Sequence, residues 1–152
     1  MSQAGSAVAV GSGGGSQPGA RACGAPKIFG RKRAEVAVVT AVHEYAAWWT
    51  LKVAKFPKDI KHSLGQRSLE LVLELLETLV EAAFVPAPER PPLLASANRQ
   101  VERLRHLTRL AHATAALPHE SYAHASAYLD DIGKQIGGWA RAKQVPGASH
   151  GP

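Results

Sequence analysis

The stretch SYAHASAYLDDIGKQIGGWA, residues 121–140, decides the fold, because its apolar side chains recur at the spacing of one helix face. Successive members are 3, 4, 3, 4 and 3 residues apart, and they are Tyr122, Ala125, Leu129, Ile132, Ile136 and Trp139. Alternating intervals of three and four keep side chains on one side of an α-helix. The sequence therefore predicts an amphipathic helix that follows Pro118.

Three earlier segments repeat this spacing. The first carries Val39, Val42, Ala46, Trp49, Val53 and Phe56. The second, which opens near Ser63 or Ser68, carries Leu69, Leu73, Leu76, Val80 and Ala83. The third runs from about residue 92 to residue 117 and carries Leu94, Ala97, Val101, Leu104, Thr108 and Ala111. We expect these faces, with Trp49, Phe56, Tyr122 and Trp139, to form the core of the protein.

Short joints separate the four predicted helices, and no segment has the period of a β-strand. The joints fall at residues 57–63, 86–92 and 117–120, where prolines interrupt the pattern. Helices joined by short connections pack beside their neighbours in alternating directions. The predicted fold is an all-α, antiparallel up-down four-helix bundle over residues 30–144.

The two ends of the chain differ from this core. Residues 1–29 are rich in Gly, Ser and Ala, include GSGGGS at 11–16, and end in basic residues, so we expect a disordered tail. Residues 145–152 are expected to form a frayed C-terminus. The single cysteine, Cys23, cannot form an internal disulfide, and no apolar run is long enough for a membrane span. We expect a cytoplasmic protein with no membrane association.

No catalytic or metal-binding motif is visible among the residues. The seven histidines form no HExxH motif and no Glu-x-x-His pair on two inward faces, and the glycines lack Walker or Rossmann spacing. We therefore expect no enzyme, no metal and no cofactor.

The distribution of charge is more informative about function than these motifs are. The chain has 18 Lys plus Arg against 12 Asp plus Glu, a net charge of +6. One basic cluster lies on the third helix and contains Arg99, Arg103, Arg105 and Arg109, with His106 and His112. A second surrounds the first joint and contains Lys52, Lys55, Lys58, Lys61 and Arg67. Aromatic residues do not interleave these clusters in sequence, so a nucleic acid would be bound through its phosphate backbone.

Two features leave alternatives open. An acidic ridge on the second helix, Glu70, Glu74, Glu77 and Glu81, could neutralise the basic clusters within or between subunits, in place of phosphate contact. The second helix is also apolar over more of its circumference than a bundle interior needs. Either another chain covers the excess, helped by small residues on the fourth helix such as Gly133 and Gly137, or the monomer buries it.

Three segments resemble a known family. FPKDIKHSLGQR at 56–67, LRHLTRLA at 104–111 and YLDDIGKQIGGWARA at 128–142 are similar to the Avd family, the accessory variability determinant of diversity-generating retroelements. That family is related to four-helix-bundle proteins encoded by intervening sequences in bacterial 23S rRNA genes. The similarity spans about residues 36–144.

The resemblance implies a barrel-like homopentamer that binds the element's reverse transcriptase and its template RNA. Such a protein would support error-prone cDNA synthesis, or mutagenic retrohoming, without performing the chemistry. The alternative is a stand-alone bundle of the rRNA intervening-sequence type, which acts as a structural or protein-interaction oligomer.

Overall fold

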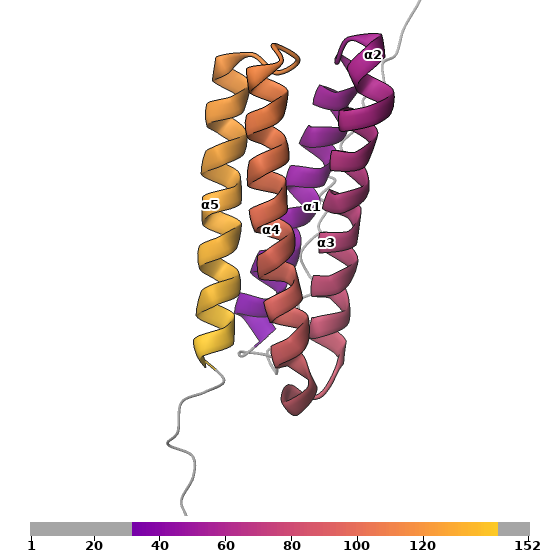
Figure 1. The fold of residues 1–152 in the computed structure, drawn as a ribbon. Coiled ribbons are helices and arrows are strands. Elements are labelled where there is room, and N and C mark those ends of the chain that lie inside the picture. The colour runs from indigo at the N-terminus through magenta and orange to yellow at the C-terminus, as the bar shows by residue number, and fades with distance from the viewer. Residues whose placement is uncertain (1–31, 143–152) are drawn as a thin grey trace, which may run out of the picture. The chain divides into compact units, whose positions relative to one another are not determined.

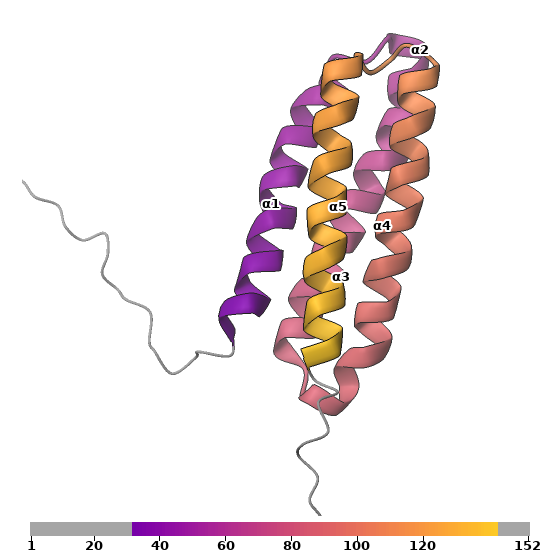
Figure 2. The same ribbon diagram turned by 90° about the vertical axis from the view of Figure 1, so that its left-hand side faces the viewer.

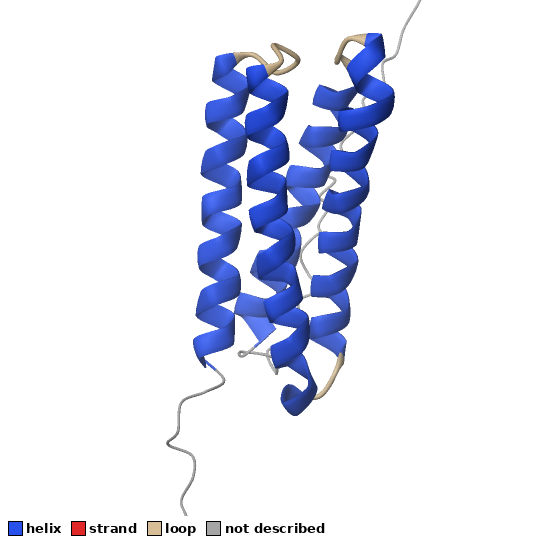
Figure 3. Ribbon diagram, viewed as in Figure 1, coloured by secondary structure: helices blue, strands red, loops and turns tan. Residues whose placement is uncertain are grey.

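The structure, a computed structural model, describes residues 32–142. Within this range it contains helices and loops and no strand (Figure 3). The four long helices are α1 (Lys32–Ala54), α3 (Gln66–Phe84), α4 (Arg90–Ala113) and α5 (His119–Ala142). The predicted tail at 1–29 and the predicted frayed end at 145–152 lie outside the described residues.

The helices form an antiparallel up-down bundle, as the sequence predicts. Each long helix runs opposite to the one before it (Figure 1). Helix α1 packs against α3 and α5, and α4 packs against the same two helices, so every helix has two neighbours. Figure 2, turned by 90°, shows the same arrangement from the side of α5. The packing order follows from short connections, which leave successive helices adjacent.

The first joint is more helical than the sequence suggests. Helix α1 ends in a turn before Pro57, which has no N–H to donate but accepts bonds of 2.9 and 2.8 Å from the N–H groups of Ile60 and Lys61. A short helix, α2 (Lys58–Ile60), passes into a π-helical turn, η3 (Lys61–Gly65), and then into α3. The predicted joint at 57–63 therefore lies between α1 and α3 as expected, but all of it except Pro57 is helical.

The second joint is also shorter than predicted. After α3, Val85 and Pro86 are extended, and a 3-10 turn, η4 (Ala87–Glu89), leads into α4 at Arg90. Pro91 and Pro92 lie inside the first turn of α4, where a missing N–H costs no intrahelical hydrogen bond. The last connection ends at Pro118, directly before α5, as the sequence predicts.

Three of the four predicted apolar faces form the core. The predicted residues of α4 are all buried, and so are those of α1 and α5 apart from Val39 and Tyr122, which are half-buried. Trp49, Phe56 and Trp139 are buried as expected.

The apolar face predicted for α3 is wrong. The buried residues are Ser68, Leu71, Val72, Leu75, Leu79 and Ala82, whereas Leu73 is 45% exposed and Val80 is 36% exposed. Because α3 is apolar on most of its circumference, two faces fit the same spacing. The face that packs inward includes the small Ser68, which lies against Trp49 of α1, and the other face is left partly open to solvent.

Candidate nucleic-acid interface

One end of the bundle carries the basic cluster predicted around the first joint, here called the basic end. Its members come from the end of α1 and the turn after it, from α2 and η3, and from the start of α3; they are Lys52, Lys55, Lys58, Lys61 and Arg67. Lys52 and Lys61 are half-buried and the other three are exposed. The α4–α5 connection lies at the same end of the bundle (Figure 1). The structure therefore places these five residues at one end of the bundle, where α1 is connected to α3.

A buried contact network fixes the backbone beneath the basic end. Gly65 is buried, and a Cβ atom added there would lie 2.9 Å from Val53 Cγ1 and 3.2 Å from Phe56 Cδ2. The Ser68 hydroxyl donates a 2.8 Å hydrogen bond to the Gly65 carbonyl and accepts one of 2.9 Å from the Trp49 indole N–H. Helix α1 and the junction of η3 with α3 therefore approach closely here, directly beneath the cations of the basic end.

The cations of the basic end differ in how far they are neutralised. Arg67 lies 3.5 Å from Glu70 and 3.8 Å from Glu74, on an exposed surface where ion pairs contribute about 0–1 kcal/mol. Within residues 32–142, by contrast, Lys55, Lys58 and Lys61 have no ion-pair partner. These three ammonium groups are the ones most available to an external anion.

The predicted cluster on α4 divides into two parts. Arg99, Arg103 and Arg109 are exposed and, in the described part of the chain, form no ion pair; we call them the arginine face. Because α4 ends beside the basic end, Arg109 lies nearer to that end and Arg99 lies nearer to the other. The three arginines are therefore spread along α4, and Arg109 is the one nearest to the basic end.

Arg105 has a different environment from its neighbours on α4. Its side chain is 32% exposed, its Nη2 lies 3.0 Å from Asp130 Oδ1 on α5, and it also pairs with Glu102. The Nη2 atom donates a 3.5 Å hydrogen bond to the Leu129 carbonyl. Arg105 thus joins α4 to α5, and its charge is already paired.

Glycines of α5 make room for arginine side chains. A Cβ atom on Gly133 would lie 3.1 Å from Arg105 Nη2, and one on Gly137 would lie 3.3 Å from Arg141 Nη1. The sequence suggested that these positions admit the backbone of a neighbouring chain. In the structure, the space beside both glycines is taken by side chains of the same chain.

The acidic ridge lies on the helix next to the arginine face. Its four residues, Glu70, Glu74, Glu77 and Glu81, are all exposed on α3, which packs against α4. Among the described residues, Arg67 pairs with Glu70 and Glu74 of the ridge, whereas Arg99, Arg103 and Arg109 form no ion pair with it. The arginine face is therefore not neutralised by the ridge within one subunit.

Sequence reasoning missed a cluster of rings between α1 and α5. The ring of His124 lies 4.6 Å from Trp48 and 5.2 Å from Tyr128, and the ammonium of Lys52 lies 5.4 Å from the centre of the Trp48 ring. The Tyr128 hydroxyl donates a 3.5 Å hydrogen bond to Glu44. We call Trp48, His124 and Tyr128 the aromatic cluster. The sequence does show that His124 and Tyr128 are four residues apart, which places them on one face of a helix. Trp48, the third ring, lies on α1 and is distant from both in sequence.

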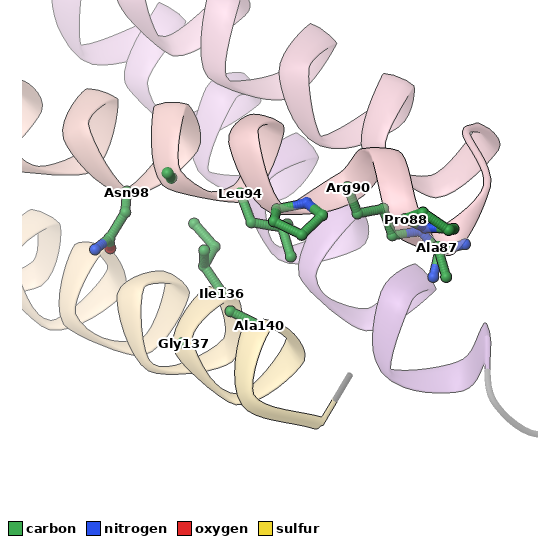
Figure 4. A pocket seen from close by; sticks show the side chains of 10 residues that line it. Ala87, Pro88, Arg90, Leu94, Asn98, Ile136, Gly137 and Ala140 are labelled. Carbon is green, nitrogen blue, oxygen red and sulfur yellow. The ribbon is translucent and has the colours of Figure 1, made fainter. Parts of the chain in front are cut away.

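A hollow of about 500 Å³ lies between the start of α4 and the end of α5, and Figure 4 shows its lining. Its walls are mainly apolar and include Leu94, Ile136 and Ala140, with Asn98 and Arg90 as polar members. The Arg90 Nε atom donates a 2.8 Å hydrogen bond to the Ala82 carbonyl, and its guanidinium lies 5.6 Å from the Trp139 ring. This arrangement ties α4 to α3 and α5 and offers no pair of groups for acid–base chemistry.

Metal centres and membrane spans have no candidate in the described part of the chain. Residues 32–142 contain no group of three or more His, Cys, Asp or Glu side chains placed to hold a metal ion. None of the helices in the same range is long and apolar enough to cross a membrane.

Comparison with known proteins gives one match. A protein-family model described as bAvd-like matches residues 38–143, which is most of the chain and the whole bundle apart from the start of α1. No curated protein and no solved structure matches the chain.

Proposed function

We propose, from the premise that this chain belongs to the bAvd-like family, that it is a non-catalytic accessory protein of a diversity-generating retroelement. In this proposal it binds the reverse transcriptase and the template RNA in the cytoplasm and supports error-prone cDNA synthesis. The RNA is held by its phosphates, with low sequence specificity. Catalysis belongs to the polymerase.

Unneutralised positive charge on the basic end and on the arginine face is the observation that carries the RNA part of the proposal. Within the described residues, Lys55, Lys58 and Lys61 of the basic end and the three arginines of the arginine face have no ion-pair partner. Lysine and arginine contacts to phosphate displace condensed counterions, which makes binding strong and dependent on salt. Arg105 and Arg67 contribute less, because carboxylates already lie against them.

An exposed apolar stripe on α3 supports assembly into an oligomer, which we propose is a barrel-like homopentamer. Leu73, Val80 and Phe84 recur at intervals of seven and four, so they share one face of the helix, and Phe84 is 84% exposed. Half-buried Leu69 and Leu76 border this face. A continuous apolar stripe on the surface of a small domain is typical of a protein–protein interface.

The RNA part is tested by the salt dependence of binding. Fluorescence anisotropy would measure the affinity for labelled template RNA between 50 and 300 mM salt, about the range over which phosphate contacts dominate. The test variants are Arg99→Ala/Arg103→Ala on the arginine face and Lys55→Ala/Lys58→Ala on the basic end. The matched control is Lys134→Ala/Arg141→Ala, which removes the same charge from exposed positions on α5.

Removing one cation that binds a phosphate of single-stranded RNA lowers the log–log salt slope by about 0.7. Both test variants are therefore expected to lower the slope by about 1.4 and to weaken binding to all sequences, while the control changes it little. If both test variants, folded by circular dichroism, keep the wild-type slope, the assignment of these cations to phosphate is wrong.

The acidic ridge favours a second candidate, the stand-alone oligomer that binds only protein. The ridge lies on α3 and the arginine face on the neighbouring α4, both exposed, so the two could pair between subunits. Exchanging the charges of Arg103 and Glu77 discriminates the candidates. Single reversals that break the oligomer, with assembly restored in the double exchange and no effect on RNA binding, would favour the protein-only candidate.

A further inference from the structure

We propose that the aromatic cluster between α1 and α5 stacks an unpaired base of single-stranded RNA, so that binding is not confined to phosphate. This inference rests on the proposed RNA-binding function and adds a second mode of contact to it. The side chains concerned are Trp48, His124 and Tyr128, with the ammonium of Lys52 over the Trp48 ring.

The geometry leaves one ring accessible and supports it from behind. His124 is exposed, whereas Trp48 and Tyr128 are half-buried and lie 4.6 and 5.2 Å from it. Behind them, the buried Tyr45 ring lies 5.9 Å from Trp48 and 5.7 Å from Tyr128, which continues the aromatic packing into the core. A base placed on the imidazole of His124 would therefore rest on a ring that other rings hold in position.

Charge complementarity identifies the occupant as a nucleic acid strand. Lys52 follows Trp48 at i+4, so it lies along the same side of α1, and its ammonium lies over the indole. Lys55 lies in the turn that directly follows α1. The strand's phosphates would reach these ammonium groups while its base reaches the rings. A charged groove beside an aromatic surface is the usual arrangement for binding single strands.

The same geometry predicts a preference for single strands over duplexes. In a duplex the bases are stacked on one another and the strand cannot offer a free face to His124. Phosphate contacts alone would bind both forms of RNA. A preference for the single strand that depends on His124 therefore separates stacking from charge.

The test uses the full chain with labelled 15-nucleotide single-stranded RNA and a blunt RNA duplex of the same length, each measured by fluorescence anisotropy across a salt series. The variant is His124→Ala. The control is His43→Ala, which removes an exposed histidine from α1 outside the aromatic cluster. Light scattering of each variant reports its oligomeric mass.

We expect His124→Ala to weaken single-strand binding by about 5- to 100-fold and to leave the salt slope unchanged, because removing a stacked ring releases no counterion. Duplex binding and the His43→Ala variant should match wild type within about twofold. Single-stranded RNA should also quench tryptophan fluorescence in wild type, and Trp48→Phe should remove most of that quenching, since Trp49 and Trp139 are buried.

Four results would overturn the inference. Equal loss of single-strand and duplex binding would assign His124 a general electrostatic role. Unchanged RNA affinity with a changed oligomeric mass would make the cluster an interface with a protein or a second copy of the chain. Wild-type binding to single strands with no effect of His124→Ala would reject stacking but keep the proposed function, whereas a wild-type protein that binds no RNA would reject both.

Discussion

The indole N–H of Trp49 donates a 2.9 Å hydrogen bond to the hydroxyl of Ser68, and both side chains are buried between α1 and α3. Ser68 in turn donates to the carbonyl of Gly65, so one hydroxyl satisfies a donor and an acceptor at the helix junction. This bond joins the two helices directly beneath the basic end. It also explains why the face of α3 that contains Ser68 turns inward.

Ser68→Ala is expected to destabilise the protein by about 1–3 kcal/mol, because it leaves the Trp49 N–H buried without an acceptor. Urea unfolding followed by circular dichroism measures the change. Ser63→Ala is the control, since Ser63 is exposed on η3, and its effect should stay within about 0.5 kcal/mol. Equal effects of the two substitutions would argue against a structural role for the Trp49–Ser68 bond.

Two glycines should respond to alanine with opposite signs. Gly65→Ala places a methyl group 2.9 Å from Val53 Cγ1 and should destabilise the protein by about 1–3 kcal/mol through overpacking. Gly138→Ala, inside α5, meets no atom within 4 Å and should stabilise the protein by about 0.5–1 kcal/mol through helix propensity. Thermal unfolding of the two variants checks the signs. If both substitutions destabilise the protein, the space beside Gly138 on α5 is filled by other atoms.

Tyr45 predicts a pH effect on stability. Burial raises the pKa of the Tyr45 phenol, and the nearby Thr108 hydroxyl acts in the opposite direction. Above about pH 10 the unfolded chain ionises this tyrosine while the folded chain keeps it neutral, so its contribution to stability is present below pH 10 and is lost as the pH rises. Tyr45→Phe should reduce the loss of stability measured by urea unfolding between pH 9 and pH 11. Tyr122→Phe, at a half-buried position, is the comparison, and an equal effect there would contradict the assignment.

The exposed stripe on α3 predicts which substitutions dissociate the oligomer. Leu73→Lys/Val80→Lys should reduce the mass measured by light scattering and leave helix content unchanged, because both side chains are partly exposed within one chain. Ala47→Lys/Ala54→Lys adds the same charge to exposed positions on α1 and should preserve the mass. If the two variants keep the same oligomeric mass, this stripe is not the interface.

The sequence predicts the bundle well, because proline positions and helical spacing are local properties. It predicts the wrong face of α3, since Leu71 and Leu73 belong to equally regular apolar faces and hydrophobicity cannot rank them. The choice depends on shape, and Ser68 leaves space and an acceptor for Trp49 of another helix. No local pattern contains that pairing.

The candidate site was predictable in composition but not in organisation. The charged residues stand out in sequence, yet nothing local separates Arg103, which is exposed and unpaired within residues 32–142, from Arg105, which lies 3.0 Å from Asp130 of α5. Likewise, Trp48 and His124 come together only because α1 and α5 are neighbours in the bundle. Contacts between helices decide which charges and rings are available to a partner.

The most direct test of the accessory-protein account is the light-scattering mass of the purified full chain, alone and mixed with the element's reverse transcriptase and template RNA, at low and moderate salt. The account predicts a homopentamer, five times the mass of one chain, that shifts to a single larger complex when both partners are present and weakens as salt rises. A monomer that elutes separately from both partners at low salt would contradict it.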